Sequence, residues 1–262
     1  MKIISWNVNG LRAITKKHTI FNNEEGTFED FVNQKNPDIL CLSEIKMNCK
    51  VDSLLETILP QYKYKFWSHC SKSAGRHGVA VFSKIKPITT VMDKLGDFDG
   101  RYLELEFEKY YLVSIYAQNS GEENLKNLEL RKKWDSEFLK RVTKLKAKKE
   151  VILTGDFNVV HLPIDTSNFE KQRNKVAGVT DLERNNFKNL LSKGFFNVFR
   201  ILHPEKIKFT YFSYRTRGRK YNSGMQIDYF LVTQKLLKYV KSINILDNIY
   251  GSDHLPIQLI LD

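Results

Sequence analysis

The chain has 262 residues, with 42 Lys and Arg against 30 Asp and Glu, so its formal charge is +12. Hydrophobic residues form 42% of it, which suffices for a packed core and excludes wholesale disorder. The charge excess favours a polyanionic partner, because phosphates attract Lys and Arg at long range. No apolar run approaches the roughly 18 residues of a membrane span, and the N-terminus lacks a signal-peptide core. We therefore expect an intracellular protein without a membrane segment, cytoplasmic in a bacterium and nuclear or viral otherwise.

Short apolar runs, rich in β-branched and aromatic residues, recur along the chain and predict β-strands. They lie at 2–8, 38–44, 78–84, 101–107, 110–117, 150–156, 227–232 and 256–262. The closely spaced runs 101–107 and 110–117 predict a hairpin.

Helical signals occur between these runs. Thr27 precedes apolar residues spaced by three or four positions and predicts a helix start. A second helix is expected to begin near 125, with an apolar face formed by Leu125, Leu128, Trp134, Phe138, Val142 and Leu145. A third is predicted to begin after Thr180, which can form a capping box with Glu183, and to stop at Gly194.

The order of these elements indicates the fold class. The strands do not alternate strictly with helices, which argues against a doubly wound sheet and favours a mixed-sheet α/β sandwich. No internal repeat, Pro- or Gly-rich linker or low-complexity tract interrupts the chain. We therefore expect a single domain over residues 1–262.

Cys41, Cys49 and Cys70 form an odd set without the short paired spacings of a zinc site or a redox dithiol. Cys41 lies within an apolar run, where a thiol packs as a small hydrophobe. We expect all three to be reduced and structural, which fits a reducing compartment.

Polar residues cluster where the apolar runs end, at positions that a strand would not select for stability. They are Asn7, Asn9, Glu44, Tyr116, Asn119, Asp156, Asn158, Asp228, Ser252, Asp253 and His254. Most have an ordinary interpretation alone, since Asn and Asp often end strands and Glu44 can form a surface ion pair with Lys46. Asp228 is harder to explain this way, because a carboxylate inside an apolar run must be paired or hydrogen-bonded.

Taken together, these residues supply the parts for metal-assisted phosphodiester hydrolysis. Mg²⁺ prefers carboxylate, carbonyl and water oxygens and bridges to substrate phosphate. Attack by water then requires a base for the nucleophile and positive groups around the charge that develops on the phosphate.

A series of motifs carries these residues through the whole chain, in the order IISWNVNGLRA, PDILCLSEIK, DGRYLE, IYAQNSG, LTGDFNVVHLPID, AGVTDLER, FTYFSYR, IDYFLV and GSDHLPI. With them the sequence resembles the exonuclease III / apurinic-apyrimidinic (AP) endonuclease family, within the DNase I-like metal-dependent phosphohydrolases. The resemblance implies a four-layer α/β sandwich, in which two mixed β-sheets pack face to face with helices outside. It also implies Mg²⁺, with Mn²⁺ as a substitute, and a monomer acting on double-stranded DNA with abasic sites or blocked 3′ ends.

The resemblance further implies a metal site. In it, Glu44 is the principal ligand and Asp253 a further one, while Asn9, Asp156 and Asn158 complete the set. Asn158 would also position water and phosphate.

The same resemblance implies catalytic roles. Asn7 would orient the catalytic carboxylate, and Asp156 would activate the attacking water. Asp228 and His254 would form a hydrogen-bonded pair that favours a protonated imidazole aimed at a phosphate oxygen. Tyr116 would lie near the departing oxygen, and which proton belongs to Asp156 and which to Tyr116 stays open.

Aromatic and basic residues interleave in the segment FTYFSYRTRGRKY at 209–221. Aromatic faces can stack on a sugar or base while cations track phosphates, although a basic hairpin tip would show the same composition. The segment resembles the family loop that wedges into duplex DNA beside an extruded nucleotide, which implies insertion of Arg215. The DNA-contacting residues implied are Asn119, Arg101, Arg215, Arg217, Arg219, Lys220, Tyr211, Phe212, Met225 and Ile227.

The chain departs from the family pattern at Met225 and Gln226, where the family has an aromatic residue followed by Arg. Met fills space without imposing one shape, so we expect a less selective pocket for a baseless deoxyribose. Ser43, Gln118 and His77 are further departures. They bear on the balance between incision at abasic sites and trimming of 3′ ends, not on the phosphodiesterase chemistry.

The sequence therefore predicts a Mg²⁺-dependent DNA repair nuclease that incises 5′ to abasic sites and has 3′-phosphodiesterase or 3′→5′ exonuclease activity. One alternative is a phosphodiesterase of the same fold that acts mainly at 3′ ends, on RNA, or on lipid or inositol phosphates. Another is a catalytically silent DNA-binding module, against which the presence of Glu44, Asp156 and His254 argues.

Overall fold

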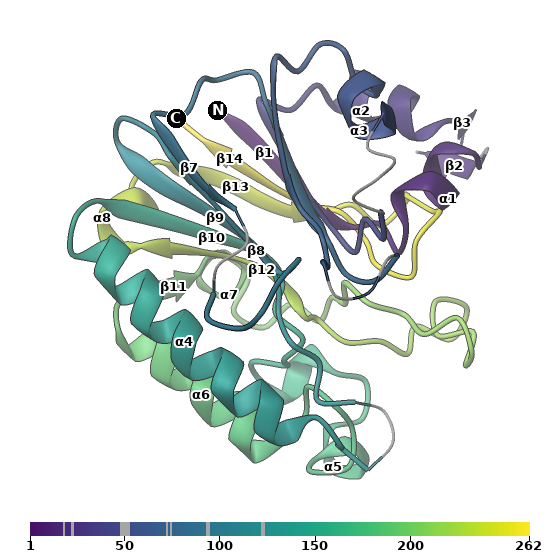
Figure 1. Ribbon diagram of the computed structural model, residues 1–262. Coiled ribbons are helices and arrows are strands. Elements are labelled where there is room, and N and C mark those ends of the chain that lie inside the picture. The colour runs from purple at the N-terminus through teal and green to yellow at the C-terminus, as the bar shows by residue number, and fades with distance from the viewer. Residues whose placement is uncertain are drawn as a thin grey trace.

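The computed structural model describes residues 1–17, 19–21, 24–47, 53–71, 73, 75–92, 95–121 and 124–262. Two six-stranded sheets lie face to face, and helices cover their outer sides (Figure 1). The predicted α/β sandwich of two mixed sheets is confirmed. Among the described residues, no helix is long and apolar enough to cross a membrane.

The first sheet has the strand order β13-β14-β1-β4-β6-β5. Its strands are β1 (Lys2–Asn7), β4 (Ile39–Ser43), β5 (Tyr64–Ser68), β6 (Val79–Ser83), β13 (Val240–Ile245) and β14 (Ile257–Leu261). β1 and β4 are parallel, while the other neighbours are antiparallel.

The second sheet has the order β11-β12-β10-β9-β8-β7. Its strands are β7 (Thr89–Met92), β8 (Tyr102–Glu106), β9 (Tyr110–Tyr116), β10 (Glu150–Asp156), β11 (Phe195–Asn197) and β12 (Asp228–Thr233). The parallel pair here is β9 with β10, and β8 with β9 forms the predicted hairpin. A separate two-stranded ribbon joins β2 (Thr19–Phe21) and β3 (Glu24–Gly26).

Helices flank both sheets. Near the first sheet lie α1 (Leu11–Thr15), α2 (Phe28–Lys35) and α3 (Ser53–Thr57). The long helices α4 (Leu128–Lys146) and α6 (Asp181–Ser192) lie side by side over the second sheet (Figure 1). Shorter segments are η1 (Pro163–Asp165), α5 (Phe169–Gln172), α7 (Val198–Leu202) and α8 (Gln234–Leu237).

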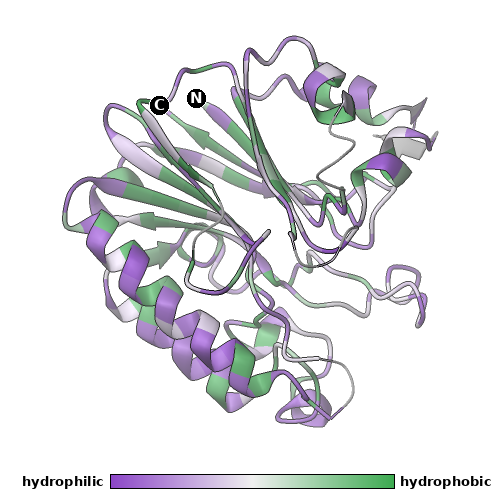
Figure 2. Ribbon diagram, in the orientation of Figure 1, coloured by the Kyte–Doolittle hydropathy of each residue, from purple (hydrophilic) through white to green (hydrophobic). Residues whose placement is uncertain are grey.

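Alternation along the strands divides the core into layers. Ile3, Cys41 and Ile152 belong to the cluster between the sheets, whereas Leu153 faces outward and packs in the cluster with Trp134 of α4. Successive side chains of a strand point to opposite faces, so both faces of each sheet are covered by apolar residues. Figure 2 shows the result: the strands are largely hydrophobic, and α4 and α6 have hydrophilic residues along their exposed sides.

Cys41 and Cys70 are free thiols, and both are buried. Burial raises the pKa of the Cys41 thiol to about 12, so it stays protonated and packs as a small apolar group. Their predicted structural role fits this burial. Cys49 lies outside the described residues.

Two of the three predicted helix starts are confirmed in detail. The Thr180 hydroxyl accepts from the backbone N–H of Glu183 at 3.2 Å, and Thr27 forms the equivalent bond with Asp30. Gly194 follows α6 with φ 86°, the left-handed conformation of a C-terminal stop. The middle helix begins at Leu128 and not near Leu125, because Leu125 has a left-handed φ of 53° in the preceding turn.

Candidate active site

The predicted polar residues meet at one end of the sandwich, around a cavity of about 640 Å³. Asn7 ends β1 and Glu44 directly follows its parallel neighbour β4, while Tyr116 and Asp156 end the parallel pair β9 and β10. The carboxyl ends of parallel strands lie at the same edge of a sheet, so each sheet delivers two of these side chains together. Asp228 joins them because it is paired with Asp156 across the antiparallel β10 and β12.

Backbone conformation at the strand ends helps to aim these side chains. Gly155 has φ 127°, and a Cβ there would lie 2.0 Å from the carbonyl oxygen of Ile115, so only glycine fits before Asp156. Glu44 and Asn158 have left-handed φ values of 50° and 49°. Non-glycine residues in this region are uncommon and concentrate at functional sites.

Asn7 lies at the centre of the hydrogen-bond network of the site, and it is 1% exposed. Its Nδ2 lies 3.0 Å from Glu44 Oε1 and 3.0 Å from Asp156 Oδ2, so one amide group donates to two carboxylates. Its Oδ1 accepts from the backbone N–H of Asn9 at 3.0 Å, which fixes the orientation of the amide. Asn7 thus holds two carboxylates from different sheets at the cavity.

Glu44 remains ionised in this setting. Burial alone would raise its pKa, but the hydrogen bond from Asn7 and the charge of Lys46 outweigh burial and lower the pKa below its usual value. Lys46 Nζ lies 2.9 Å from Glu44 Oε2, and the Glu44 side chain is 17% exposed. A carboxylate that is ionised and still reaches the cavity can bind a cation.

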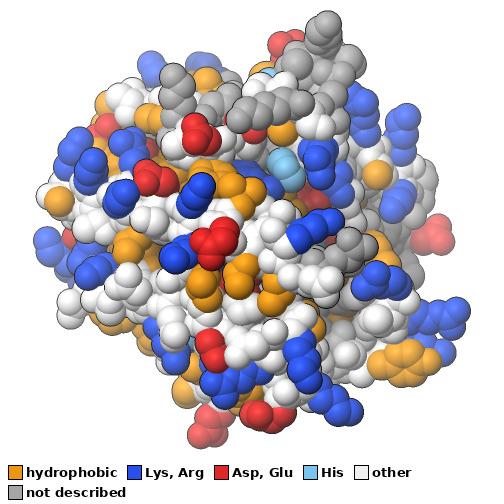
Figure 3. Space-filling model, turned by 60° about the horizontal axis from the view of Figure 1, so that its bottom comes forward, with side chains coloured by type: hydrophobic (Ala, Val, Ile, Leu, Met, Phe, Trp, Pro, Cys, Tyr) orange, Lys and Arg blue, Asp and Glu red, His pale blue; other side chains and the backbone are white. Residues whose placement is uncertain are grey.

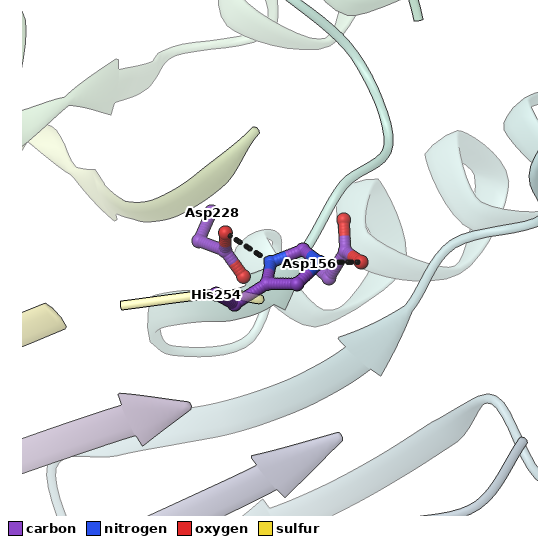
Figure 4. A group of neighbouring side chains, drawn as sticks. All are labelled: Asp156, Asp228 and His254. Atoms are coloured by element: carbon purple, nitrogen blue, oxygen red, sulfur yellow. Dashed lines mark hydrogen bonds and ion pairs between the residues drawn. The ribbon is translucent and has the colours of Figure 1, made fainter. Parts of the chain in front are cut away.

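His254 lies between two carboxylates (Figure 4). Its Nδ1 is 2.8 Å from Asp228 Oδ2, and its Nε2 is 3.8 Å from Asp156 Oδ2. Burial favours the neutral ring, but the charges of Asp228 and Asp156 outweigh burial and raise the pKa of His254 to about 10. The imidazole is therefore a cation at neutral pH.

Asp156 differs from His254, because burial outweighs the effect of the neighbouring opposite charge on its pKa. Burial raises its pKa to about 7, the nearby cation His254 opposes this, and the charges of Asp228 and Glu44 add to it. Its Oδ1 accepts from the backbone N–H of Asn158 at 2.9 Å. A carboxylate that titrates near neutrality is suited to general-base chemistry.

Asn158 and Asn119 form a pair beside Asp156. Asn119 Nδ2 donates to Asn158 Oδ1 at 2.9 Å, and Asn158 Nδ2 donates to the carbonyl of Ala117 at 2.9 Å. Behind them, buried Arg131 donates to the carbonyl of Asn158 at 2.9 Å. Sequence analysis did not identify Arg131, because nothing in its helix distinguishes it from the charged residues around it.

Tyr116 faces the cavity with its phenol protonated. Burial raises its pKa well above the usual value, and the charges of Glu44 and Asp156 raise it further. The guanidinium of Arg101 lies over its ring, 4.8 Å from the centroid, and the ring of His77 lies 5.8 Å away. Tyr116 is thus enclosed by side chains that hold its position.

Arg101, which the sequence predicts to contact DNA, lies mainly inside the protein. Arg101 is 5% exposed, and its Nη1 donates to the carbonyls of Tyr116 and Ala117 at 3.2 and 3.3 Å. Its Nη2 lies 3.1 Å from a ring nitrogen of His77. These contacts occupy the guanidinium, so Arg101 supports Tyr116 from inside the protein.

The cavity offers oxygen ligands suited to a hard divalent cation. Glu44, Asp156, Asn9 and Asp253 all line it. Asn9 Nδ2 donates to Asp253 Oδ1 at 3.0 Å, and Asn9 Oδ1 accepts a hydrogen bond from Lys46 Nζ. Carboxylate and amide oxygens fit Mg²⁺ or Mn²⁺.

A second arrangement within the site could hold a metal ion: ligand atoms of Asp156, Asp228 and His254 lie within 4.8 Å of one another. As a cation, His254 has no ring lone pair to offer a metal. In that protonation state, these three residues form an ion-pair network, and the oxygen ligands around Glu44 remain for the metal.

The predicted DNA-contacting residues of the segment at 209–221 do not all lie in one place. Tyr211 and Arg215 line the catalytic cavity, as do Met225 and Ile227. Around this opening, Lys and Arg side chains are spread over the face that Figure 3 turns forward. The cavity is thus lined by acidic, apolar and basic side chains together.

Two residues of this segment have side chains that are held mainly by contacts within the protein. Phe212 is 8% exposed and packs with Phe209 and Leu255, so it belongs to the core. Arg219 donates to the carbonyls of Ile249 and Asp247, so its guanidinium ties the segment to another loop. Arg217 and Lys220 are exposed and line a second pocket.

Residues 4–254 match the model of the endonuclease/exonuclease/phosphatase family. The whole chain is 35% identical to an exodeoxyribonuclease of Bacillus subtilis, over that protein's full length. It is 37% identical to the DNA repair nuclease APEX1 of Danio rerio, and the alignment covers all of this chain and 82% of that protein.

Solved structures share the fold. An AP endonuclease from Leishmania major superimposes with a TM-score of 0.85 at 24% identity, covering 99% of this chain and 87% of that one. A 3′-5′ exonuclease from Neisseria meningitidis gives 0.84 at 23% identity, with both chains fully covered. These chains therefore share the fold of this protein.

Proposed function

The chain belongs to the endonuclease/exonuclease/phosphatase family and is a DNA repair nuclease, and we propose that it hydrolyses the phosphodiester 5′ to abasic sites with Mg²⁺ bound. We propose that it also removes blocking groups or nucleotides from 3′ ends and that it acts as a monomer. The observation that carries this proposal is that one cavity is lined by the carboxylates of Glu44 and Asp156, the imidazolium of His254 and an apolar wall.

Asp156 is the base in this proposal. Its pKa of about 7 allows it to accept a proton from water at neutral pH, and the N–H of Asn158 orients the carboxylate. Tyr116 cannot serve as the base, because its raised pKa keeps the phenol protonated. Its hydroxyl is instead a hydrogen-bond donor for the departing oxygen.

His254 supplies fixed positive charge. Asp228 orients the ring through Nδ1, and Nε2 faces Asp156 at the cavity. A buried cation stabilises the negative charge that develops on phosphate oxygens more strongly than an exposed one. The side-chain amides of Asn119 and Asn158 add neutral hydrogen bonds beside it.

Members of the family are metal-dependent, and the oxygen ligands of Glu44, Asp253 and Asn9 fit Mg²⁺. When bound, Mg²⁺ would act as a Lewis acid that polarises the scissile phosphate. Glu44 contributes to this role because it is ionised, and Asn7 keeps it in place.

The apolar end of the cavity supports the abasic substrate. Val176, Tyr211, Met225 and Ile227 provide this wall and form one apolar cluster. A deoxyribose without a base has no polar base edges, so it can enter beside an apolar wall without leaving such edges unpaired. The Met225 thioether adapts its shape, so 3′-terminal nucleotides are also expected to enter.

The test compares a duplex carrying one abasic-site analogue with an undamaged duplex that has a recessed 3′ end. Each is incubated with Mg²⁺ and with chelator, and products are resolved on a sequencing gel. Metal-dependent cleavage 5′ to the lesion, leaving a 3′-hydroxyl, is expected. Cleavage of RNA or inositol phosphates with intact abasic DNA would reject the proposal, as would DNA binding without any cleavage.

A further inference from the structure

A second pocket of about 180 Å³ lies beside the catalytic cavity. Ser213 and Asp253 line both, so the two spaces share a wall. A polymer bound with one residue in the catalytic cavity can therefore place a neighbouring residue in the second pocket. Drug-sized sites span about 300–1,000 Å³, so this pocket has room for a smaller group.

The walls of this second pocket combine apolar surface with positive charge. Phe212 and Gly218 form part of the apolar lining, and the ring of Tyr214 is 59% exposed at its side. Arg217 and Lys220 are exposed and also line it. An aromatic face next to cations is the chemistry that binds a nucleotide, because the base stacks and the phosphate is neutralised.

The pocket is held in shape by contacts within its own loop. Gly218 N donates to Ser213 O at 2.9 Å, and Ser223 N donates to Gly218 O at 2.8 Å. A Cβ at Gly218 would lie 2.5 Å from Ser223 O, so the turn requires glycine. A ligand therefore meets a shaped surface and orders little of the loop on binding.

Contacts with a segment distant in sequence also hold the loop in place. The guanidinium of Arg219 lies 3.5 Å from the ring centroid of Tyr250, and its Nη1 donates to the carbonyl of Ile249 at 2.7 Å. Arg219 thereby fixes the loop against the segment that leads to His254. Arg219 of the second pocket therefore contacts the same segment that carries His254.

We propose that the second pocket binds one unpaired nucleotide of the DNA strand next to the scissile bond. The base stacks on Tyr214, and Arg217 and Lys220 contact the phosphate. A paired base within a duplex is stacked on both faces and cannot enter. The inference rests on the proposed function in taking DNA as the substrate, and it adds a preference for DNA with an unpaired nucleotide beside the lesion.

The test uses two duplexes of one sequence, each with an abasic-site analogue. One carries a single extra unpaired nucleotide beside the lesion, and the other is fully paired. The wild-type protein should show a KM about tenfold lower on the first, with an equal kcat, because stacking of one base contributes on this scale. Tyr214→Leu should abolish the difference and leave kinetics on the paired duplex unchanged.

Tyr221→Leu is the matched control. Tyr221 belongs to the same loop and is 65% exposed, and it is not among the described residues that line the pocket. Its substitution should preserve the preference. Equal KM values for the two duplexes in the wild type, or a preference that survives Tyr214→Leu, would overturn the proposal.

Two further arms separate the remaining outcomes. A duplex whose extra unpaired residue itself lacks a base should bind like the paired one; an equal gain would mean that the pocket reads only the backbone, which would overturn stacking. Fluorescence anisotropy with the same DNAs in chelator measures the preference without cleavage. If neither duplex is cut, the proposed function fails, while the anisotropy difference still decides the role of the pocket.

Discussion

Asp228 and His254 form a buried ion pair, with 2.8 Å between Asp228 Oδ2 and His254 Nδ1 and with both residues less than 5% exposed. This pair converts a histidine into a permanent cation at neutral pH. The same cation lies beside Asp156, whose pKa of about 7 it keeps from rising further. One pair thus sets the charge of both groups at the reaction site.

Removal of the Asp228 charge should shift the pH dependence of cleavage. The pKa of His254 is raised from 6.5 to about 10, so the stability that its charged form contributes is complete below pH 6.5 and is lost as pH rises through about 10. In Asp228→Asn the pKa should fall, and the alkaline limb of the pH–kcat profile should move to lower pH. An unchanged limb would show that His254 charge does not support catalysis.

Asp156→Asn should remove the basic carboxylate while it keeps a side chain of nearly the same volume. We expect kcat to fall by about two to four orders of magnitude, the usual contribution of a general base. Duplex affinity, measured by anisotropy, should stay within a few-fold of wild type, because the cations around the cavity remain. Retention of near-normal cleavage would reject Asp156 as the base.

Arg101→Met should lower kcat about tenfold through loss of the contacts that hold Tyr116. Because Arg101 is buried, the slope of log affinity against log salt should not change. Arg215→Ala is the comparison, since Arg215 is exposed at the cavity, and its loss should reduce the slope by about 0.9. A reduced slope in Arg101→Met would instead support the prediction that Arg101 contacts a phosphate.

Thr180→Ala should destabilise the protein by about 1–2 kcal/mol through loss of the buried helix cap. For a chain of this size that corresponds to a decrease in Tm of about 2–4 °C or more. Thr27→Ala removes the same kind of cap at an exposed helix end and should have a smaller effect. Equal Tm changes in calorimetry would contradict the role of burial.

The predicted and missed strands differ by their place in the sheets. All the strands predicted from the sequence are central in the two six-stranded sheets, whereas β5, β7, β11 and β13, which were not predicted, form the edges of those sheets. The short ribbon of β2 and β3 was not predicted either. Central strands are covered on both faces and are nearly continuous apolar runs. The edge strands β7 and β13 are mostly half-buried or exposed, so their composition resembles that of a loop, and β11 is only three residues long.

The candidate site, like the fold, could be predicted only in part from the sequence. Residues at strand ends were found because strand ends are visible in local composition, and Asn7 does lie with Glu44 and Asp156. The sequence did not show that the side chains of Arg101, Phe212 and Arg219 are held by contacts within the protein. In each case a partner distant in sequence buries or occupies the side chain, and composition does not report such partners.

The sequence by itself determined the central strands, the helix caps and the type of chemistry, because apolar periodicity, capping residues and strand-end polar groups are local signals. Only the tertiary structure decided which charges reach the cavity and what their pKa values are. Both depend on burial and on partners such as Asn7 and Asp156, which are 149 positions apart. Desolvation and pairing at short distance arise only after the sheets have packed.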